Sequence, residues 1–521
     1  MSNLQFKMSG IRALLGSFIL GSIVRAIPEV LAHPYPISWD MVHYAYFMKT
    51  GIIWEHWSTF FTSPWLLYAL IFPIHNQFGV DSFLLLKITG PILFGFNTCG
   101  VHWFAKSLLN WETKKSFLAG GLFSIQLASL RISSEFLKNT LGLGLLLFTL
   151  PLIKRLNSKR GFATFVLLSL LTVFAHEYAA VTLLAISLVL VLSGLLNREE
   201  KRIRFAKKLI VAILPASMIF LAGVYLRMFP VSYAYSPAVG PNLVWVNDTT
   251  LQNYGPLFFF VNYLGMNTGL DIYPNYLFLA LSVLALFALL YLPYFYLVWK
   301  GFFRNEIIDV WTGLLIVGSF GCLITPFFAL DLWHRWMFML AYPFTFYAVN
   351  GAENLLSRIS QCKTTLGKIR NKVSVMVSAT VLLAVIYLAT PFLMVHAGFG
   401  IYSLYPTSRY FSSAPTVPYQ DIDGTISAMQ WLKDNMHNDS CAVLQNAFAT
   451  WAKLYLKNSQ NVIAYINDVD LAVNLALQKN YQNIYFVCWN KEIGWYGTYV
   501  PENFKEELQS FDRISVFEYV R

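Results

Sequence analysis

Residues 275–299 read NYLFLALSVLALFALLYLPYFYLVW, a stretch without a single charged side chain. A helix needs about 20 apolar residues to cross the hydrocarbon core of a bilayer, so this stretch predicts a transmembrane helix. The whole chain has the same character. Its 521 residues are 56% hydrophobic and only 12% charged, more apolar than a water-soluble domain is able to bury. The sequence therefore predicts an integral membrane protein.

Apolar runs of similar length recur on both sides of this stretch. We predict about eleven spans, at residues 8–27, 82–105, 116–131, 139–154, 161–177, 179–196, 209–227, 275–299, 309–329, 335–353 and 374–396. The first lacks a small-residue cleavage site, so we interpret it as a retained signal anchor. The fold class expected is an all-α polytopic membrane protein with a small carboxy-terminal α/β domain.

The basic residues orient the predicted bundle. The net charge is +11, but the Lys and Arg residues form short clusters between apolar runs, which is typical of topology selection and not of a nucleic-acid-binding face. If the amino terminus is cytoplasmic, the inner segments hold most of the 38 Lys and Arg residues. The odd number of spans then puts the tail outside. We expect a multi-pass protein of the cell membrane, or of the ER membrane in a eukaryote.

Two loops on the predicted outer side are long. Loop 28–81 contains WEHWSTFFTSPWLLYALIFPIHNQFG, whose apolar runs are broken by His and Pro, so we expect amphipathic helices that lie in the membrane interface. Loop 228–274 is rich in Tyr, Pro, Asn and Gly. Its composition suits a cover over a wet cavity or a plain connection.

The composition shifts after residue 396. We predict a transmembrane domain over 1–396, a linker over 397–419 and an α/β domain over 420–521. Within the last, ISAMQWLKDNM and VDLAVNLALQKN are typical of helices, whereas CAVLQ and NIYFVCWN are typical of buried strands. Cys441 and Cys488 lie in these strands and either form a disulfide or remain free thiols. Asn247 and Asn438 are glycosylation acceptors on the predicted outer side.

Ionisable residues gather near one boundary of the membrane in this topology. They are Asp40, His43, Lys87, Glu135, Lys138, His176, Glu177, Asp331, His334 and Arg335. Ionisable groups are costly beside a bilayer and are candidate functional groups there. A transporter would place them near the midplane of two related halves, and the sequence shows no convincing internal repeat. The asymmetry favours a reaction centre at the membrane surface.

The arrangement resembles a known superfamily. An outer loop carries Asp40, Tyr44 and Gly51; an aromatic segment runs from Ser63-Pro64-Trp65 to Gly79; and the second span opens with Lys87. These features look like the GT-C superfamily of membrane glycosyltransferases, within it most like the protein O-mannosyltransferase and aminoarabinose transferase (ArnT-like) group. Met41 stands where many relatives carry a second acid, and the WWDYG signature of oligosaccharyltransferases is absent.

The resemblance implies transfer of one sugar from a polyprenyl-phosphate donor, dolichyl or undecaprenyl, to a glycan, protein or lipid acceptor outside the cytoplasm. Such a reaction needs a base for the acceptor hydroxyl and a cation for the departing phosphate. Asp40 is the candidate base for an inverting attack. The alternative for Asp40 is a helix cap, since Ser38 and Asp40 are both good capping residues.

Arg335 is the candidate partner of the donor phosphate, because a guanidinium binds two phosphate oxygens at once. Its alternative is an interfacial anchor among Trp333 and Trp336. His334 and Lys87 are assigned to the same phosphate. For His334 the alternative is a place in the aromatic belt, and for Lys87 it is a lysine that reaches to the interface.

Glu135 is assigned a catalytic part, as an acid that orients the acceptor or binds metal, and a solvated loop acid is the alternative. We assign His43, Tyr44, His176 and Glu177 to the substrate cavity. Neighbouring residues of a helix point about 100° apart, so His176 and Glu177 are not expected to chelate one ion together. Asp40, Glu135 and His176 are a conceivable set for Mg or Mn, although no spacing requires a metal.

Two rival functions remain open. A polyprenyl-linked glycan ligase or flippase shares the lipid partner without needing Asp40 as a base, and a secondary transporter uses no sugar donor.

Overall fold

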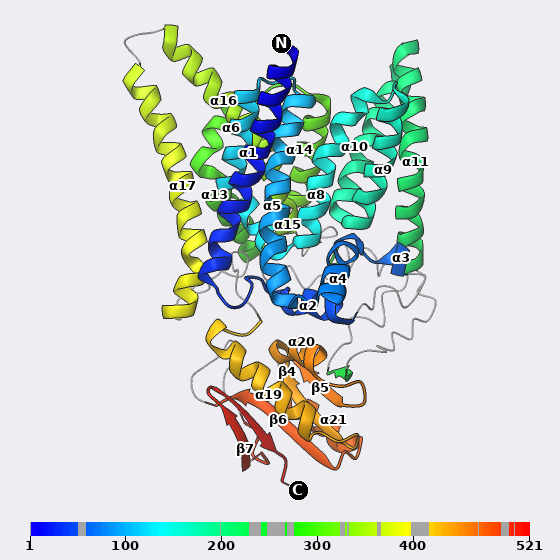
Figure 1. Ribbon diagram of the computed structural model, residues 1–521, viewed down its shortest axis with the longest axis vertical. Coiled ribbons are helices and arrows are strands. Elements are labelled where there is room, and N and C mark those ends of the chain that lie inside the picture. The colour runs from blue at the N-terminus through cyan, green and yellow to red at the C-terminus, as the bar shows by residue number, and fades with distance from the viewer. Residues whose placement is uncertain are drawn as a thin grey trace.

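The computed structural model describes residues 2–50, 59–197, 199–228, 241–246, 266–267, 276–323, 329–330, 333–361, 366–397, 416–466, 468–490, 500–504 and 506–520. Figure 1 shows a bundle of long helices above a smaller domain that contains a β-sheet. The amino terminus lies at the far end of the bundle, and the carboxy terminus lies at the bottom of the smaller domain (Figure 1).

A helix occupies each of the eleven predicted span positions. These helices are α1 (Ser2–Leu31), α5 (Ser82–Ser107), α6 (Thr113–Ile125), α8 (Leu137–Thr149), α9 (Lys159–Ala175), α10 (Glu177–Leu196), α11 (Glu200–Met228), α13 (Tyr276–Lys300), α14 (Glu306–Phe320), α16 (Ala341–Gln361) and α17 (Leu366–Ala397). Within the described residues, eight stretches are long and apolar enough to cross a membrane. Of the helices at the predicted positions, α6, α9 and α16 do not meet that standard.

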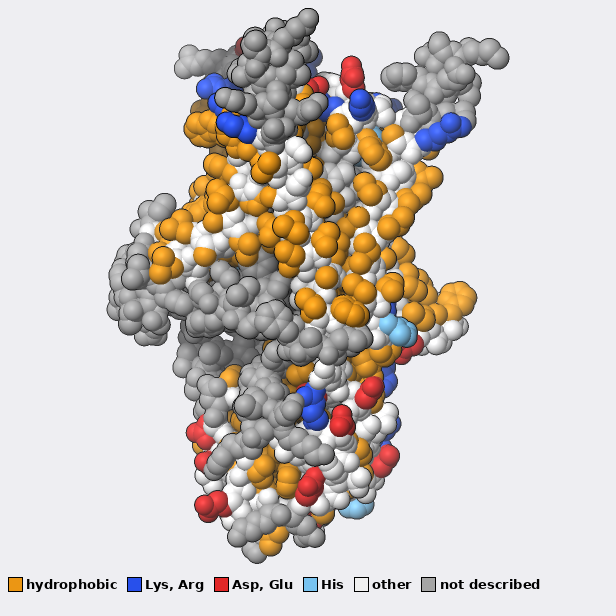
Figure 2. Space-filling model, turned by 90° about the vertical axis from the view of Figure 1, so that its left-hand side faces the viewer, with side chains coloured by type: hydrophobic (Ala, Val, Ile, Leu, Met, Phe, Trp, Pro, Cys, Tyr) orange, Lys and Arg blue, Asp and Glu red, His pale blue; other side chains and the backbone are white. Residues whose placement is uncertain are grey.

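Apolar side chains cover the middle of the bundle's outer surface, whereas charged side chains lie at its upper end and over the lower domain (Figure 2). Surfaces of this kind are stable only where lipid covers the apolar belt. The prediction of a polytopic helical membrane protein with a carboxy-terminal α/β domain is confirmed.

Close helix packing explains two glycines of the bundle. Helices α1 and α5 pack along much of their length. A Cβ atom on Gly21 would overlap Thr98, and one on Gly95 would overlap Ser22. Small residues let helix backbones approach closely in a membrane, where dispersion contacts hold the helices together.

The prediction of one helix over 116–131 is wrong, because the chain breaks at Gln126. Gln126 adopts an extended conformation between α6 and the short helix α7 (Leu127–Glu135). Its side chain is buried and donates from Nε2 to Oγ1 of Thr345 at 2.8 Å. This polar contact with α16 compensates the bonds that a continuous helix would have made.

Three further breaks interrupt the helices. Phe136 separates α7 from α8, His176 separates α9 from α10, and Leu340 separates α15 (Trp333–Met339) from α16. The short helices α7 and α15 pack against each other near the lower end of the bundle. Short, broken helices are tolerated at membrane depth where surrounding protein satisfies their backbone groups.

Loop 28–81 forms helices α2 (Met41–Thr50), α3 (Thr59–Thr62) and α4 (Leu66–Phe78). They lie at the lower end of the bundle (Figure 1). Helix α4 buries Leu67 and Ile71 and exposes Leu70 and Phe78. An amphipathic helix with an exposed apolar face suits the boundary between lipid and water, and the interfacial position of these helices stays a prediction.

The lower domain is a six-stranded sheet with three helices. Its strands are β1 (Asn242–Trp245), β4 (Ser440–Gln445), β5 (Asn461–Tyr465), β6 (Asn483–Trp489), β7 (Glu506–Phe511) and β8 (Ile514–Glu518), in the order β1-β5-β4-β6-β8-β7. Strands β1, β5, β4 and β6 are parallel, and β8 and β7 add an antiparallel edge. The helices are α19 (Ile422–Asn435), α20 (Asn446–Tyr455) and α21 (Val469–Gln478).

All four segments predicted for this domain are confirmed as helices or strands. Strand β1 was not predicted, because it comes from loop 228–274, far away in the sequence. A second piece of that loop, β2 (Met266–Asn267), pairs with β3 (Ala329–Leu330).

Cys441 and Cys488 are free thiols on the adjacent strands β4 and β6. The register pairs Cys441 with Ile484. Cys488 is four residues further along β6, too far for a disulfide.

The lower domain packs directly onto the bundle. Phe83 of α5 contacts Trp451 of α20, with ring centroids 6.0 Å apart. Lys49 of α2 donates to the carbonyl of Leu454 at 3.2 Å, and the hydroxyl of Tyr35 donates to Asp423. One hydrophobic core is shared by α2, α4 and the sheet domain.

Candidate functional site

The candidate site lies where α2 passes between the bundle and the lower domain (Figure 1). Asp40 directly precedes α2. Two residues earlier, Ser38 has a φ of 151°, which is rare for a residue with a side chain. Its Oγ accepts a hydrogen bond from the Asp40 N–H at 3.0 Å. The backbone before Asp40 is thus strained and held in place, as is common at functional sites.

The carboxylate of Asp40 accepts no hydrogen bond from a backbone amide in the described part of the chain. Burial of this carboxyl raises its pKa to about 6, and the nearby carboxylate of Glu135 contributes to the rise. Arg335, Lys138 and Arg131 act in the opposite direction by favouring the ionised form. A carboxyl with such a pKa is largely ionised at pH 7 and still accepts a proton readily.

The junction of α7 and α8 brings three charged side chains towards α2. Glu135 forms a largely buried ion pair with Arg131, one turn earlier on α7. The hydroxyl of Tyr44 donates to the backbone carbonyl of Glu135 at 3.4 Å. The ammonium of Lys138 lies 5.9 Å from the centre of the Tyr44 ring. Tyr44 is one turn after Asp40, so these contacts place the junction beside the Asp40 turn.

Arg335, from α15, completes the positive side of the site. Its guanidinium lies 4.6 Å from the centre of the Phe136 ring, and that of Arg131 lies 5.5 Å from the same ring. The Nε atom of Arg335 is buried and has no hydrogen-bond partner among the described residues. A buried donor of this kind is costly unless an acceptor from elsewhere completes it.

Trp336 and Tyr178 lie next to this guanidinium. Their rings contact each other edge to face, with centroids 5.1 Å apart. The indole N–H of Trp336 is also buried without an acceptor in the described structure, and the Tyr178 side chain interacts with Arg335. Neither Trp336 nor Tyr178 was singled out as a site residue from the sequence, because aromatic residues are too frequent in this chain to stand out.

His334 and His43 occupy different surroundings. His334 packs edge-on against Trp333 and Phe338, with centroids 5.9 Å away in both cases. His43 is exposed on α2, and its ring contacts Phe47 at 4.6 Å. Their assignments to the donor phosphate and to the cavity remain predictions.

Lys87 lies on the other side of the Asp40 turn. Its ammonium donates to the carbonyl of Tyr35 at 3.3 Å, and it is close enough to Glu29 to interact with that carboxylate. The structure therefore places Lys87 with the start of the turn and not with Arg335. A phosphate would have to reach both groups for the two to act together.

The prediction that His176 and Glu177 are neighbours on one helix is wrong. His176 is extended and caps α10, with Nδ1 accepting from the Tyr178 N–H at 3.2 Å. The 100° offset of a helix does not apply at such a break. The His176 Nε2 and Glu177 Oε2 atoms consequently lie 3.9 Å apart.

No group of three or more His, Cys, Asp and Glu side chains within the described ranges could hold a metal ion. The conceivable set of Asp40, Glu135 and His176 is not assembled there. A requirement for Mg or Mn stays a prediction. Asp331 and Asn247 lie outside the described residues, whereas Asn438 is exposed on the lower domain.

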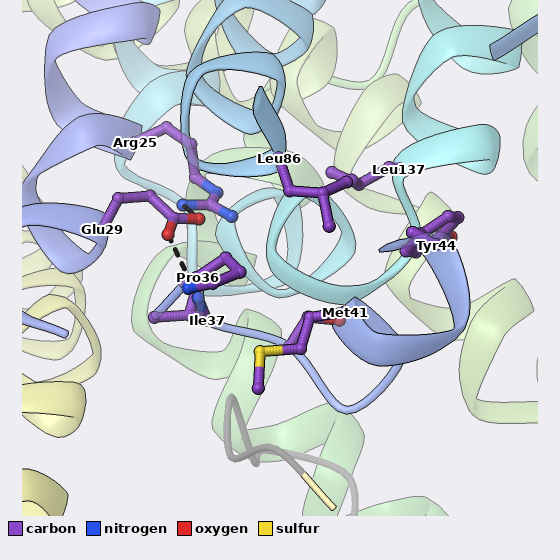
Figure 3. A pocket seen from close by; sticks show the side chains of 9 residues that line it. Arg25, Glu29, Pro36, Ile37, Met41, Tyr44, Leu86 and Leu137 are labelled. Carbon is purple, nitrogen blue, oxygen red and sulfur yellow. Dashed lines mark hydrogen bonds and ion pairs between the residues drawn. The ribbon is translucent and has the colours of Figure 1, made fainter. Parts of the chain in front are cut away.

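A small pocket lies behind the Asp40 turn, with an empty volume of about 210 Å³. Arg25 and Glu29 of α1 line it together with Ile37, Met41 and Tyr44 (Figure 3). Neither Arg25 nor Glu29 was expected at the site from the sequence. The sequence does contain a signal for them, which is a pair of opposite charges four residues apart at the end of an apolar run.

Comparisons with known proteins bear on the fold. No family model matches the chain, and no curated protein matches it. Among solved structures, it is similar to the crystal structure of ArnT from Cupriavidus metallidurans in the apo state. The likeness covers 100% of this chain and 99% of that one, with 11% identical residues and a TM-score of 0.48.

Proposed function

We propose that this protein is a membrane glycosyltransferase of the GT-C type, which moves one sugar from a polyprenyl-phosphate donor to an acceptor hydroxyl. One observation carries the proposal. The Asp40 carboxylate, with a pKa of about 6, is set in the field of Arg335, Lys138 and Arg131 at the end of an apolar bundle. A lipid-linked anion and an acceptor from water meet only at such a boundary.

Asp40 is the proposed base. The acceptor oxygen attacks the anomeric carbon and passes its proton to the Asp40 carboxylate, while the bond from that carbon to the phosphate oxygen breaks. The phosphate departs with the electron pair and remains attached to its lipid. A single displacement of this kind inverts the configuration at the anomeric carbon.

Arg335 is the proposed binding group for the departing phosphate. Its buried Nε has no described partner, and a guanidinium stabilises the charge that develops on phosphate oxygens. Lys138 and Arg131 add positive potential, which favours the ionised lipid phosphate over a neutral ligand. His334 is assigned to the same phosphate, as a second ligand. Lys87 joins it only if the phosphate extends from Arg335 to the start of the Asp40 turn, where Lys87 donates to Tyr35.

Glu135 is proposed to hold Arg131 in place, since the two form an ion pair, and to help orient the acceptor. His43, Tyr44, His176 and Glu177 are assigned to the surrounding cavity. Membrane lipid is the medium of the bundle, and nucleic acid is not an expected partner.

The site and the lower domain are proposed to face away from the cytoplasm. Both lie at the end of the bundle opposite the amino terminus. Lys and Arg side chains are visible at the amino-terminal end (Figure 2), and such residues favour the cytoplasmic side. A cysteine introduced at the exposed Asn438 should react with an impermeant reagent on intact cells.

A transfer assay tests the proposal. Purified protein in liposomes receives radiolabelled polyprenyl-phosphate sugar and an extract of candidate acceptors. Wild type should transfer label, whereas Asp40→Asn should lose about 10²-fold or more of the rate, as for removal of a general base. Arg335→Ala should be impaired comparably. Asp470→Asn and Arg304→Ala, at exposed positions away from the site, are matched controls that should retain transfer.

The same assay separates the rivals. Asp40→Asn with full activity would favour a ligase or flippase that needs no base there. Movement of solute across the liposome without any sugar transfer would identify a transporter. Chelation by EDTA, followed by return of Mg or Mn, tests the metal requirement.

A further inference from the structure

A buried ion pair near the lower end of α1 has no part in the chemistry proposed above. Arg25 and Glu29 are one helical turn apart, with an Nη1 to Oε1 distance of 2.8 Å and side-chain exposures of 2% and 5%. They belong to a helix that is long and apolar enough to cross a membrane. Burying two charges in such a place is costly, and the pair itself contributes little to stability.

The remaining hydrogen bonds of the pair lead in two directions. Nε and Nη2 of Arg25 both donate to the carbonyl of Ser133, at 3.3 Å each. Oε2 of Glu29 accepts from the N–H of Ile37 at 3.1 Å (Figure 3). The pair therefore connects α7, which carries Arg131 and Glu135, with the turn that carries Asp40.

The structure makes room for this connection. Arg25 and Glu29 share a pocket with Ser38 and with Tyr44 (Figure 3). A Cβ atom on Gly90 of α5 would approach Nη2 of Arg25 to 3.1 Å, so the absence of a side chain there leaves space for the guanidinium. The Ile37 bond is next to Ser38, the residue whose strained backbone leads into Asp40.

We propose that Arg25 and Glu29 are positioning residues, which fix the 37–40 turn against α7 so that the Asp40 carboxylate faces the cations of the site. This inference rests on the proposed function, and it identifies Arg25 and Glu29 as the residues that hold the proposed base, Asp40, in place. A strained turn keeps its geometry only where surrounding contacts determine it. Displacement of a catalytic group by about 1 Å is enough to reduce turnover about 10²-fold.

The decisive variant replaces both charges by apolar groups of similar size, Arg25→Met with Glu29→Leu. Such an exchange leaves no unpaired charge, so the protein is expected to fold with undiminished thermal stability. Glu29→Gln, which leaves Arg25 buried without its counter-charge, is expected to be less stable. Hydrogen exchange of the amides of residues 37–44 and the steady-state constants for transfer are then measured on the double variant.

We expect faster exchange over 37–44 and a fall in kcat of about 10²-fold, with the KM for the donor unchanged because Arg335 is untouched. In an Asp40→Asn background, the double variant should reduce kcat no further. The matched control is Lys115→Met with Glu353→Leu, which removes the Lys115–Glu353 ion pair between α6 and α16. It should change neither the exchange of residues 37–44 nor kcat.

Unchanged exchange over residues 37–44 in the folded double variant would overturn the inference, whether or not the protein transfers sugar. Faster exchange with a wild-type kcat would overturn it as well. If Asp40→Asn alone keeps full activity, the proposed function fails, and the exchange measurement still decides whether the pair holds the turn.

Discussion

The surroundings of Asp40 act on its pKa in opposite directions. Its burial and the neighbouring Glu135 favour the neutral acid, whereas three cations favour the carboxylate, and the balance places its pKa at about 6. A base with such a pKa is largely ionised at pH 7 and still accepts a proton readily. Keeping this carboxylate ionised at pH 7 therefore costs folding free energy.

The pH dependence of transfer should reflect this balance. We expect kcat/KM to rise with pH through about pH 6, as Asp40 loses its proton. Lys138→Met removes a cation that stabilises the carboxylate, so the rise should move to higher pH. The measurement is a pH–rate profile of both proteins. A profile with the same midpoint in the variant would contradict the electrostatic role of Lys138.

The stability of the folded protein should also depend on the ionisation of Asp40, but it should fall as the pH rises. The folded pKa of Asp40 lies above the ordinary value of 3.8, so ionisation destabilises the folded state as pH rises from about 4 to 6. Asp40→Asn removes this penalty and should gain about 1–3 kcal/mol above pH 6 and nothing below pH 4. Thermal unfolding in detergent across this range measures it. A gain that is equally large at pH 3.5 would point to a cause other than ionisation.

At the scale of elements, the breaks in the helices place the site. Straight spans would carry Arg131 and Arg335 along separate helix axes. Instead, the breaks at Gln126, Phe136 and Leu340 create short helices, and both guanidiniums meet at the Phe136 ring. At Gln126, the hydrogen bond to Thr345 takes the place of bonds that a continuous helix would have made.

The contact between Gln126 and Thr345 allows a test of this idea. Both side chains are buried, and they share a hydrogen bond of 2.8 Å. A double-mutant cycle with Gln126→Leu and Thr345→Val should give a coupling energy of about 0.5–1.5 kcal/mol in thermal or denaturant unfolding. Strictly additive effects would show that the break is held by packing alone.

At the scale of the whole molecule, the lower domain is part of the site's framework. Strand β1 comes from the loop between α11 and α13 and pairs with β5. Helix α20 packs against α2, whose Tyr44 contacts the carbonyl of Glu135. Besides its own linker, the domain is thus connected to the bundle through β1 and through the contact between α20 and α2.

Deletion of residues 420–521 should therefore destabilise α2. We expect the amides of α2 to exchange faster and transfer to fall to background, because α2 loses the apolar surface of α20 and the bond from Lys49 to Leu454. Hydrogen exchange on the truncated protein in detergent measures this. Unchanged protection of α2 would show that the bundle holds this helix without the domain.

The sequence by itself determined the class of the molecule. Apolar runs such as 275–299 fix the transmembrane helices, since their length and lack of charge leave no soluble alternative. Alternating and helical periodicity after residue 420 likewise revealed the α/β domain. Asp40 and Arg335 became candidates because ionisable groups are rare and costly at such positions, and Asp40 also because its loop resembles that of the GT-C superfamily.

Only the tertiary structure decided which of those groups meet. Lys87 and Arg335 carry the same charge and lie beside similar boundaries in the sequence, yet Lys87 bonds to Tyr35 and Arg335 packs on Phe136. The pairing of Arg25 with Ser133 and of β1 with β5 joins segments far apart in the chain. Local pattern carries no information on such contacts, because helix breaks and close packing between distant segments set the direction of each side chain.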